Sequence, residues 1–325
     1  MDPFENVELG ATGVTVTRLG MGLAPIGGLF SPVGDETAVA AVDEAWRLGV
    51  RFFDTAPFYG AGLSERRAGR ALRRHDRSRY TLGTKVGRLI RDEASEESEV
   101  WTEKSGAVFD FSAAGVRASH EESLRRLGLD RVDVLHLHDP DDHFTEAATQ
   151  ALPALAQLRK EGAVRAVSAG MNQSAMLTEF ARTGLLDCVL LAGRYSLLDQ
   201  SGLADLLPEC RRRNIAVIVG GVYNSGVLAD PFRPATFDYR PAPPEVVARA
   251  QAMARLCDRH GVPLRAAALQ FPLAHPAVTS VLVGMRSPEE AADAAAMARV
   301  RIPGGLWRDL ADAWLLDREI PVPLP

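Results

Sequence analysis

Short apolar runs alternate with amphipathic stretches along almost the whole chain. Each apolar run is only a few residues long and ends at a glycine, a polar residue or a turn, which is typical of a buried strand. We predict eight strands, at residues 20–25, 51–54, 80–84, 132–138, 164–169, 187–192, 215–219 and 280–283.

Amphipathic segments follow these strands, with apolar residues at helical spacing on one face. Residues 35–49, for example, place Val39, Val42 and Trp46 on one side and end at Gly49. The other predicted helices span residues 63–73, 112–128, 145–160, 173–182, 203–213, 244–260, 263–273 and 304–317, and one more begins at Ser287.

Eight strand-then-helix units predict an α/β protein with a (β/α)8 TIM barrel. No linker divides the chain, so we expect one barrel domain over residues 1–325. Residues 7–18 alternate apolar and polar positions around two glycines, which indicates an N-terminal β-hairpin that caps one end of the barrel. Residues 87–106 are polar, acidic and without periodicity, and we predict a long loop there.

Composition supports a globular protein and narrows its partners. The chain has 325 residues, of which 46% are hydrophobic and 24% charged, and its net charge is -5. It shows no basic stripe for nucleic acid, no apolar signal core at the start and no apolar run long enough to span a membrane. Cys188, Cys210 and Cys257 lie far apart and are interpreted as reduced structural thiols. We expect a cytoplasmic protein that acts on a small molecule, and the sequence leaves its oligomeric state open.

In a barrel of this kind, functional residues gather where the carboxyl ends of the strands meet. Polar residues and glycines stand at the ends of seven predicted strands: Asp54, Lys85, His138, Asn172, Tyr195, Gly220 and Arg286. Arg88 and Arg91 follow the third strand and are interpreted as solvated loop charges.

Three of these residues, Asp54, Lys85 and His138, form a candidate acid–base set with Tyr59, which lies in the turn after the second strand. A free tyrosine has a pKa of about 10, and a nearby ammonium group lowers it by stabilising the phenolate. Lys85 can supply that charge to Tyr59, and Asp54 can hold Lys85 in place. His138 can donate a hydrogen bond to a substrate oxygen. Such a set is suited to hydride transfer, in which an oxygen gains or loses a proton while a cofactor exchanges the hydride.

The motifs around these residues resemble those of the aldo-keto reductases. Residues 53–60 (FDTAPFYG) match the family's Asp/Tyr motif, residues 84–87 (TKVG) its lysine motif, and residues 133–140 (DVLHLHDP) the strand that ends in its histidine. The resemblance implies that the catalytic residues are Asp54, Tyr59, Lys85 and His138. His136 is interpreted instead as a hydrogen-bonded histidine of the barrel interior.

Further motifs indicate a subgroup. Residues 108–112, 123–128, 138–141, 170–173 and 192–199 resemble the D-threo-aldose (L-fucose) 1-dehydrogenases, and the pyridoxal 4-dehydrogenases and L-galactose dehydrogenases share these features. The resemblance implies oxidation of a sugar hemiacetal at C1 to a lactone. Pyridoxal oxidation and general aldehyde reduction remain alternatives.

The resemblance also implies NAD or NADP as cofactor. The predicted cofactor-binding residues are Gly22, Asp54, Asn172, Tyr195, Gly220, Gly221, Val222, Tyr223, Ser225, Gly226, Leu228, Gly284, Arg286, Ser287 and Glu290. Glycines after the seventh strand are typical of a backbone that closely approaches a pyrophosphate. The predicted substrate-binding residues are Phe58, Tyr59, Trp101, His138 and Asp139.

The chain departs from the wider family at three cofactor positions. Ala192 stands for the usual glutamine, Gly220 for the aromatic that stacks on nicotinamide, and Ala294 for the asparagine that meets adenine. Val222 or Tyr223 can replace the aromatic. Arg286 suits the 2′-phosphate of NADP, whereas Glu290 would repel it and can accept a hydrogen bond from a free 2′-hydroxyl. We therefore predict use of both dinucleotides, with a preference for NAD.

Two interpretations from other classes stay open. The paired His136 and His138, with Asp139, Asp141 and His143 nearby, resemble the ligands of metal-dependent hydrolase barrels. The second interpretation is a barrel that binds a cofactor but has a regulatory and not a catalytic role. Bound zinc would favour the former, and turnover of an aldose with NAD would exclude the latter.

Overall fold

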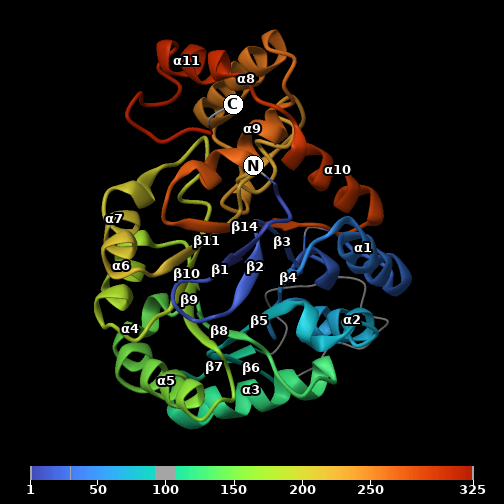
Figure 1. Cartoon of the computed structure of the whole chain (residues 1–325), viewed down its shortest axis with the longest axis vertical. Coiled ribbons are helices and arrows are strands. Elements are labelled where there is room, and N and C mark those ends of the chain that lie inside the picture. The colour runs from blue at the N-terminus through green and yellow to red at the C-terminus, as the bar shows by residue number, and fades with distance from the viewer. Residues whose placement is uncertain (1, 30, 92–106, 324–325) are drawn as a thin grey trace.

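The computed structural model describes residues 2–29, 31–91 and 107–323. Its centre is a closed barrel of eight strands, as expected (Figure 1). The strands are β3 (Leu19–Gly22), β4 (Phe52–Asp54), β5 (Thr81–Val86), β8 (Val134–His138), β9 (Ala166–Met171), β10 (Cys188–Ala192), β11 (Ala216–Gly220) and β14 (Val278–Gly284). Each pairs in parallel with the next in chain order, and β14 pairs with β3 to close the barrel.

The helices surround the barrel, and most of them bury one apolar face in the core around it, whereas α11 packs on α8 (Figure 1). They are α1 (Asp35–Leu48), α2 (Leu63–Leu72), α3 (Ala113–Leu127), α4 (Phe144–Glu146), α5 (Leu152–Lys160), α6 (Ser174–Arg182), α7 (Leu206–Arg213), α8 (Pro244–Arg259), α9 (Leu264–Gln270), α10 (Pro288–Arg299) and α11 (Gly304–Asp312). The larger core lies between strands and helices, because the outward side chains of each strand meet the apolar stripe of the helices.

A second, smaller core fills one end of the barrel interior. Inward side chains such as Phe52, Val134 and Ile218 meet Leu9 and Val16 there. The latter two belong to the predicted hairpin, formed by β1 (Asn6–Glu8) and β2 (Thr15–Thr17). The hairpin therefore closes the amino-terminal end of the barrel, which leaves the carboxyl end for a site.

The predicted loop at residues 87–106 is partly wrong. Residues Arg88–Ile90 form strand β6, which pairs antiparallel with β7 (Ala107–Phe109). The polar sequence hides this pairing because its partner strand lies beyond the acidic stretch. Residues 92–106, which include the predicted substrate residue Trp101, lie outside the described residues.

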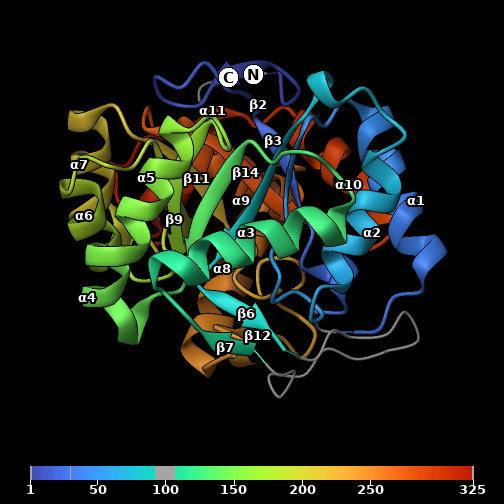
Figure 2. The same cartoon turned by 90° about the horizontal axis from the view of Figure 1, so that it is seen from below.

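Hairpin β6–β7 lies at the end of the barrel opposite the amino-terminal hairpin (Figure 2). A second small hairpin, β12 (Thr236–Phe237) with β13 (Arg240–Pro241), lies at the same end. Strands β12 and β13 could not be predicted, because two-residue strands carry no recognisable periodicity. Both hairpins border the open end of the barrel.

Three predicted helices differ in detail. The helix at residues 145–160 contains a π-helical segment, Ala147–Ala151, before α5. Pro153 has no N–H to donate to the preceding turn, which accounts for the irregularity. Helix α7 begins only at Leu206, whose amide is capped by Asp205, and α11 ends at Asp312, before Trp314 with φ +59°. Within the described ranges, none of the helices has the length and apolar character needed to cross a membrane.

Candidate active site

Asp54 and Lys85 meet at the carboxyl ends of neighbouring strands. The Lys85 ammonium donates to the Asp54 carboxylate and, at 2.8 Å, to the carbonyl oxygen of Thr55. The other Asp54 oxygen, Oδ1, lies 3.1 Å from Nε2 of His136. All three side chains are buried, so the pair is screened from water. The contact agrees with the prediction that Asp54 orients Lys85.

This cluster favours a charged carboxylate. Burial alone would raise the pKa of Asp54, but Lys85 and then His136 outweigh it and lower that pKa to about 2. Burial lowers the pKa of His136 against the opposing effect of Asp54, so its imidazole is neutral near pH 7. Gly83 makes the cluster possible, because a Cβ there would lie 2.7 Å from Oδ1 of Asp54.

Tyr59 reaches the cluster from the turn after β4. The centroid of the Tyr59 ring lies 5.0 Å from Nζ of Lys85. The turn packs tightly against residues Pro25–Gly27. At the contact point Gly60, with φ +63°, lies next to the backbone of Gly27. A Cβ on Gly60 would lie 2.3 Å from the Gly27 carbonyl oxygen, so only glycine fits. The turn is therefore held in one place.

The prediction that the pKa of Tyr59 is lowered is wrong, because the sum of all influences in this structure raises it. Although the side chain is only partly buried, the surrounding protein raises the pKa of Tyr59 to about 12, with Lys85 as the opposing influence. Lys85 thus acts in the predicted direction but does not overcome desolvation. Near neutral pH the hydroxyl keeps its proton and can donate it.

His138 completes the group at the end of β8. Its ring lies 5.7 Å from the Tyr59 ring and 6.1 Å from the Phe58 ring, edge to face in both cases. Burial, with the charges of Arg88 and Lys85, lowers the pKa of His138 well below its usual value. The imidazole is therefore neutral, with one N–H available as a hydrogen-bond donor. Its Nδ1 has no hydrogen-bond partner among the described residues.

Arg88 and Asp139 extend the group beyond the predicted catalytic residues. Arg88 donates from Nη2 to Oδ2 of Asp139 at 2.8 Å. Its guanidinium lies 4.3 Å from the centroid of the Phe58 ring. The Arg88 side chain is only 13% exposed, so the interpretation of it as a solvated loop charge is wrong. The position of Arg88 could not be predicted, because it depends on the unpredicted pairing of β6 with β7.

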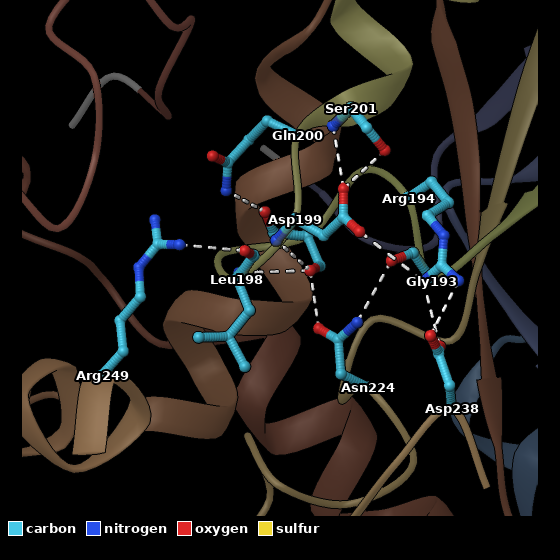
Figure 3. A network of polar contacts seen from close by, with 10 residues as sticks. Gly193, Arg194, Leu198, Asp199, Gln200, Ser201, Asn224, Asp238 and Arg249 are labelled. Atoms are coloured by element: carbon cyan, nitrogen blue, oxygen red, sulfur yellow. Dashed lines mark hydrogen bonds and ion pairs between the residues drawn. The ribbon is translucent and has the colours of Figure 1, made fainter. Parts of the chain in front are cut away.

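A polar network fixes the loop between β11 and β12 (Figure 3). Asn224, buried and at φ +45°, donates to the carbonyl oxygen of Gly193 at 3.1 Å and accepts from the Ser196 hydroxyl at 2.6 Å. Arg194 forms a two-pronged ion pair with Asp238 at 3.0 and 2.8 Å. The loops after β10 and β11 and the turn of the β12–β13 hairpin are thereby tied together.

The turn between β12 and β13 presents Tyr239 at the open end. Asp238 and Tyr239 both have positive φ, at +49° and +61°, which matches a two-residue hairpin turn but is unusual for these side chains. The Tyr239 amide donates to Oγ of Ser225 at 3.2 Å. Tyr239 also contributes to the raised pKa of Tyr59, in line with a position near the catalytic group. The sequence carried no signal for it.

The predicted cofactor residues are placed unequally. Gly22, Asn172, Gly220 and Gly284 stand at or next to strand ends, as expected. Ser225 and Gly226 adopt positive φ of +57° and +109°, with open space beside Gly226. This backbone is compatible with close approach of a phosphate.

Other members of the predicted set face inward. The Tyr195 ring packs against Phe271, with 5.3 Å between the ring centroids. Val222 and Leu228 are buried in the larger core between strands and helices, called the outer core below. The amides of Gly226 and Leu228 donate to the Tyr223 carbonyl oxygen. In this conformation these side chains and amides are not available to a dinucleotide. Val222 could replace the missing aromatic only by leaving the core.

Arg286 and Glu290 lie at the start of α10. Glu290 accepts from Nε of Arg286 at 2.7 Å and from its backbone amide at 2.9 Å. Arg286 also donates to the Ser31 hydroxyl at 2.6 Å. The oxygen of Ser287 caps the helix by accepting from the Glu290 amide. A carboxylate thus occupies the place where an anion would meet Arg286.

The metal-site interpretation lacks a ligand set in the part of the chain that the structure describes. There, no group of three or more His, Cys, Asp or Glu side chains is arranged to hold a metal ion. His136 faces Asp54 inside the barrel, and the His143 ring instead packs at a tilt against Phe109 and Phe111. The geometry therefore favours the acid–base interpretation of this end of the barrel.

Comparisons with known proteins point the same way. The chain is 41% identical to a D-threo-aldose 1-dehydrogenase of a Pseudomonas species, over 94% of this chain and 96% of that protein. It is 39% identical to a pyridoxal 4-dehydrogenase of Microbacterium luteolum (96% and 98% covered) and 37% identical to an L-galactose dehydrogenase of Arabidopsis thaliana (88% and 86% covered).

The fold has a close counterpart among solved structures. A glycerol dehydrogenase of Gluconobacter oxydans aligns over 99% of this chain and 98% of its own, with a TM-score of 0.79 and 23% identity. The model of the aldo/keto reductase family matches residues 18–311. This range contains the barrel and all four residues of the group, Asp54, Tyr59, Lys85 and His138. The chain therefore belongs to the aldo/keto reductase family and is an oxidoreductase.

Proposed function

We propose that this protein oxidises a sugar hemiacetal at C1 to a lactone with NAD or NADP. The observation that carries the proposal is the convergence of Tyr59, Lys85 and His138 at the open end of the barrel. Two of the three relatives described above are named for the oxidation of sugars. The candidate substrates are L-fucose, D-arabinose and L-galactose, and the whole chain is proposed to form one barrel domain.

Each residue of the group has a proposed role. Tyr59 exchanges the proton of the reacting oxygen, as general base in oxidation and general acid in reduction. Lys85 opposes the desolvation of the Tyr59 phenolate, and Asp54 fixes Lys85. Neutral His138 positions the reacting oxygen by donating a hydrogen bond, and Phe58, whose ring meets that of His138, is proposed to contact the substrate.

The dinucleotide, when bound, supplies or accepts the hydride. The chain offers a fitting cradle at the strand ends, where Gly22, Gly220 and Gly284 carry no side chains. The loop after β11, fixed by Asn224, is proposed to meet the pyrophosphate with Gly221, Tyr223 and Ser225. Arg286, Ser287 and Glu290 are proposed to meet the adenosine ribose.

A substrate panel tests the proposal. Initial rates of NADH and NADPH formation with L-fucose, D-arabinose, L-galactose and pyridoxal are compared with rates of reduction of simple aldehydes. We expect turnover of at least one aldose. Oxidation of pyridoxal alone would select the runner-up, which one relative's name supports. Activity with simple aldehydes alone would overturn the sugar proposal.

Removing the Asn224 side chain should weaken dinucleotide binding. Asn224→Gly keeps the positive φ accessible but loses two hydrogen bonds, to Gly193 and Ser196, that hold the loop. We expect the dissociation constant of the dinucleotide to rise roughly tenfold, since each bond contributes on the order of 1 kcal/mol. Asn214→Gly is the matched control, because Asn214 also has positive φ (+57°) but ends α7. An unchanged constant in Asn224→Gly would show that the loop does not need this network.

Cofactor preference should depend on Glu290. Because Glu290 occupies both the side chain and the amide of Arg286, a 2′-phosphate would have to displace it. A free 2′-hydroxyl needs no such displacement, so NAD is preferred. We expect Glu290→Gln to raise kcat/KM for NADP roughly tenfold, about 1.4 kcal/mol, with little change for NAD.

Glu289→Gln is the control for this change. Glu289 is an exposed carboxylate on the same helical turn, so its removal alters the local charge without freeing Arg286. Comparable shifts for both dinucleotides in Glu290→Gln would place Glu290 away from the 2′ position.

A further inference from the structure

Arg88 is held in a fixed place beside the catalytic group. Its guanidinium lies between two aromatic rings, 4.3 Å from the centroid of Phe58 and 5.0 Å from that of Phe109. Nη2 binds Asp139 at 2.8 Å, while the buried Nε has no hydrogen-bond partner among the described residues. Aromatic packing and a charge-assisted bond together restrict this long side chain, so it can orient the carboxylate of Asp139.

Asp139 has an unusual backbone conformation. It follows His138 directly and has φ +43°, a conformation that non-glycine residues rarely adopt outside constrained sites. Its side chain is 33% exposed, so it is not fully enclosed by the protein. Oδ2 of Asp139 lies 3.5 Å from Nε2 of His138. The acceptor and the proposed donor therefore stand side by side.

This spacing matches two oxygens on neighbouring carbon atoms. If the reacting oxygen accepts from His138, a hydroxyl on the next carbon lies close enough to donate to Asp139. We propose that Arg88 and Asp139 form a recognition pair for a hydroxyl group next to the reacting carbon, with Asp139 as the acceptor and Arg88 as its positioning residue. This inference rests on the proposed function and names the feature of the substrate that the site selects.

The charge of Arg88 is needed for this recognition. Burial raises the pKa of Asp139 and Arg88 opposes that change, so the cation favours the ionised carboxylate, which accepts hydrogen bonds. Arg88 satisfies only part of the carboxylate, so a substrate without the hydroxyl would cover its remaining acceptor positions and leave them without a donor. Such an unmet acceptor costs on the order of 1–3 kcal/mol, so a preference of roughly 10- to 100-fold is expected.

Two aldehydes that differ by one hydroxyl test the pair directly. Reduction of 2-hydroxypropanal is compared with reduction of propanal, and oxidation of an aldose with that of its 2-deoxy form. In the wild type we expect kcat/KM to favour the hydroxylated member roughly 10- to 100-fold, mainly through KM. Asp139→Asn and Arg88→Met should reduce this ratio to within about threefold, and Arg88→Lys should restore part of it.

The matched controls are Arg91→Met and Asp142→Asn. Both remove the same charges from exposed positions close in sequence to Arg88 and Asp139, and both should keep the wild-type ratio. The ratio is independent of how much folded enzyme each preparation contains. Equal losses with both members of a substrate pair in Arg88→Met would indicate a purely structural role and overturn the proposal.

The outcomes separate this inference from the proposed function. A preference for 2-hydroxypropanal without any oxidation of aldoses would support the recognition pair and overturn the sugar assignment. Oxidation of aldoses and their 2-deoxy forms at equal rates would support the sugar assignment and overturn the pair. A wild-type enzyme that shows no preference within either substrate pair would also overturn it.

Discussion

Tyr59→Phe is expected to lower kcat by roughly 10²- to 10⁴-fold, the usual contribution of a positioned acid or base. The ring and its contacts with Lys85 and His138 remain, so the pocket keeps its shape. Only the proton-transferring hydroxyl is lost. We therefore expect the dissociation constant of the dinucleotide to change by less than about threefold, since the proposed cofactor contacts come from other residues.

The pH profile provides a second readout for Tyr59. Burial raises its pKa to about 12, and a general base must be deprotonated to act. The rate of oxidation should therefore increase with pH through the alkaline range, whereas reduction, which uses the protonated form, should not need high pH. In Tyr59→Phe the residual oxidation should lose this rise.

Tyr80→Phe is the control for this substitution. Tyr80 is buried between Trp46 and Phe53, and its hydroxyl has no hydrogen-bond partner in the described part of the chain. We expect near wild-type turnover from it. Turnover at the wild-type rate in Tyr59→Phe would falsify the assignment of Tyr59 as the proton-transfer residue.

Lys85→Met should affect both stability and turnover. The substitution leaves the buried Asp54 carboxylate without its cation, and breaking such a pair costs about 3–5 kcal/mol. Turnover should fall as well, because Lys85 is the group that opposes desolvation of the Tyr59 phenolate. Unfolding by urea, followed by circular dichroism, and initial rates at saturating substrate measure the two effects.

The double variant Asp54→Asn/Lys85→Met separates these effects. It removes both charges together, so we expect the free energy of unfolding to recover by at least about 2 kcal/mol relative to Lys85→Met. Turnover should stay low, since no ammonium faces Tyr59. Recovery of activity along with stability would mean that Lys85 serves the fold alone.

Acid should weaken the wild type more than the double variant. The pKa of Asp54 is about 2 in the folded protein, below its ordinary 3.8, so the unfolded chain takes up this proton more readily. The resulting stabilisation is present above about pH 4 and is lost as the pH falls toward 2; it amounts to roughly 2 kcal/mol. The double variant lacks this carboxylate, and its unfolding free energy should depend less on pH in that range.

The barrel could be predicted from the sequence because its pattern is local. Strands such as β8 are buried along their whole length and appear as short runs, whereas helices such as α1 and α3 bury one apolar face, which appears as helical periodicity. The parallel arrangement then forces strand ends to converge. The sequence is therefore sufficient to predict that Asp54, Lys85 and His138 lie together.

The positions of side chains on loops could not be predicted in this way. Tyr195 follows a strand end, yet its ring packs against Phe271 in the outer core. Asp238 meets Arg194 across 44 residues of sequence, and no periodicity connects them. The net pKa of Tyr59 also required the structure, because it depends on how burial compares with the charge of Lys85.

The sequence by itself determined the barrel, its amino-terminal hairpin and the residues at the strand ends, whose mutual positions follow from regular hydrogen bonding between neighbouring strands. Only the tertiary structure decided that Arg88 lies against Asp139 and that Tyr239 stands at the open end. These placements depend on the paths of two hairpins outside the barrel. Such paths are set by contacts between distant segments, for which the order of apolar and polar residues along the chain carries no periodic signal.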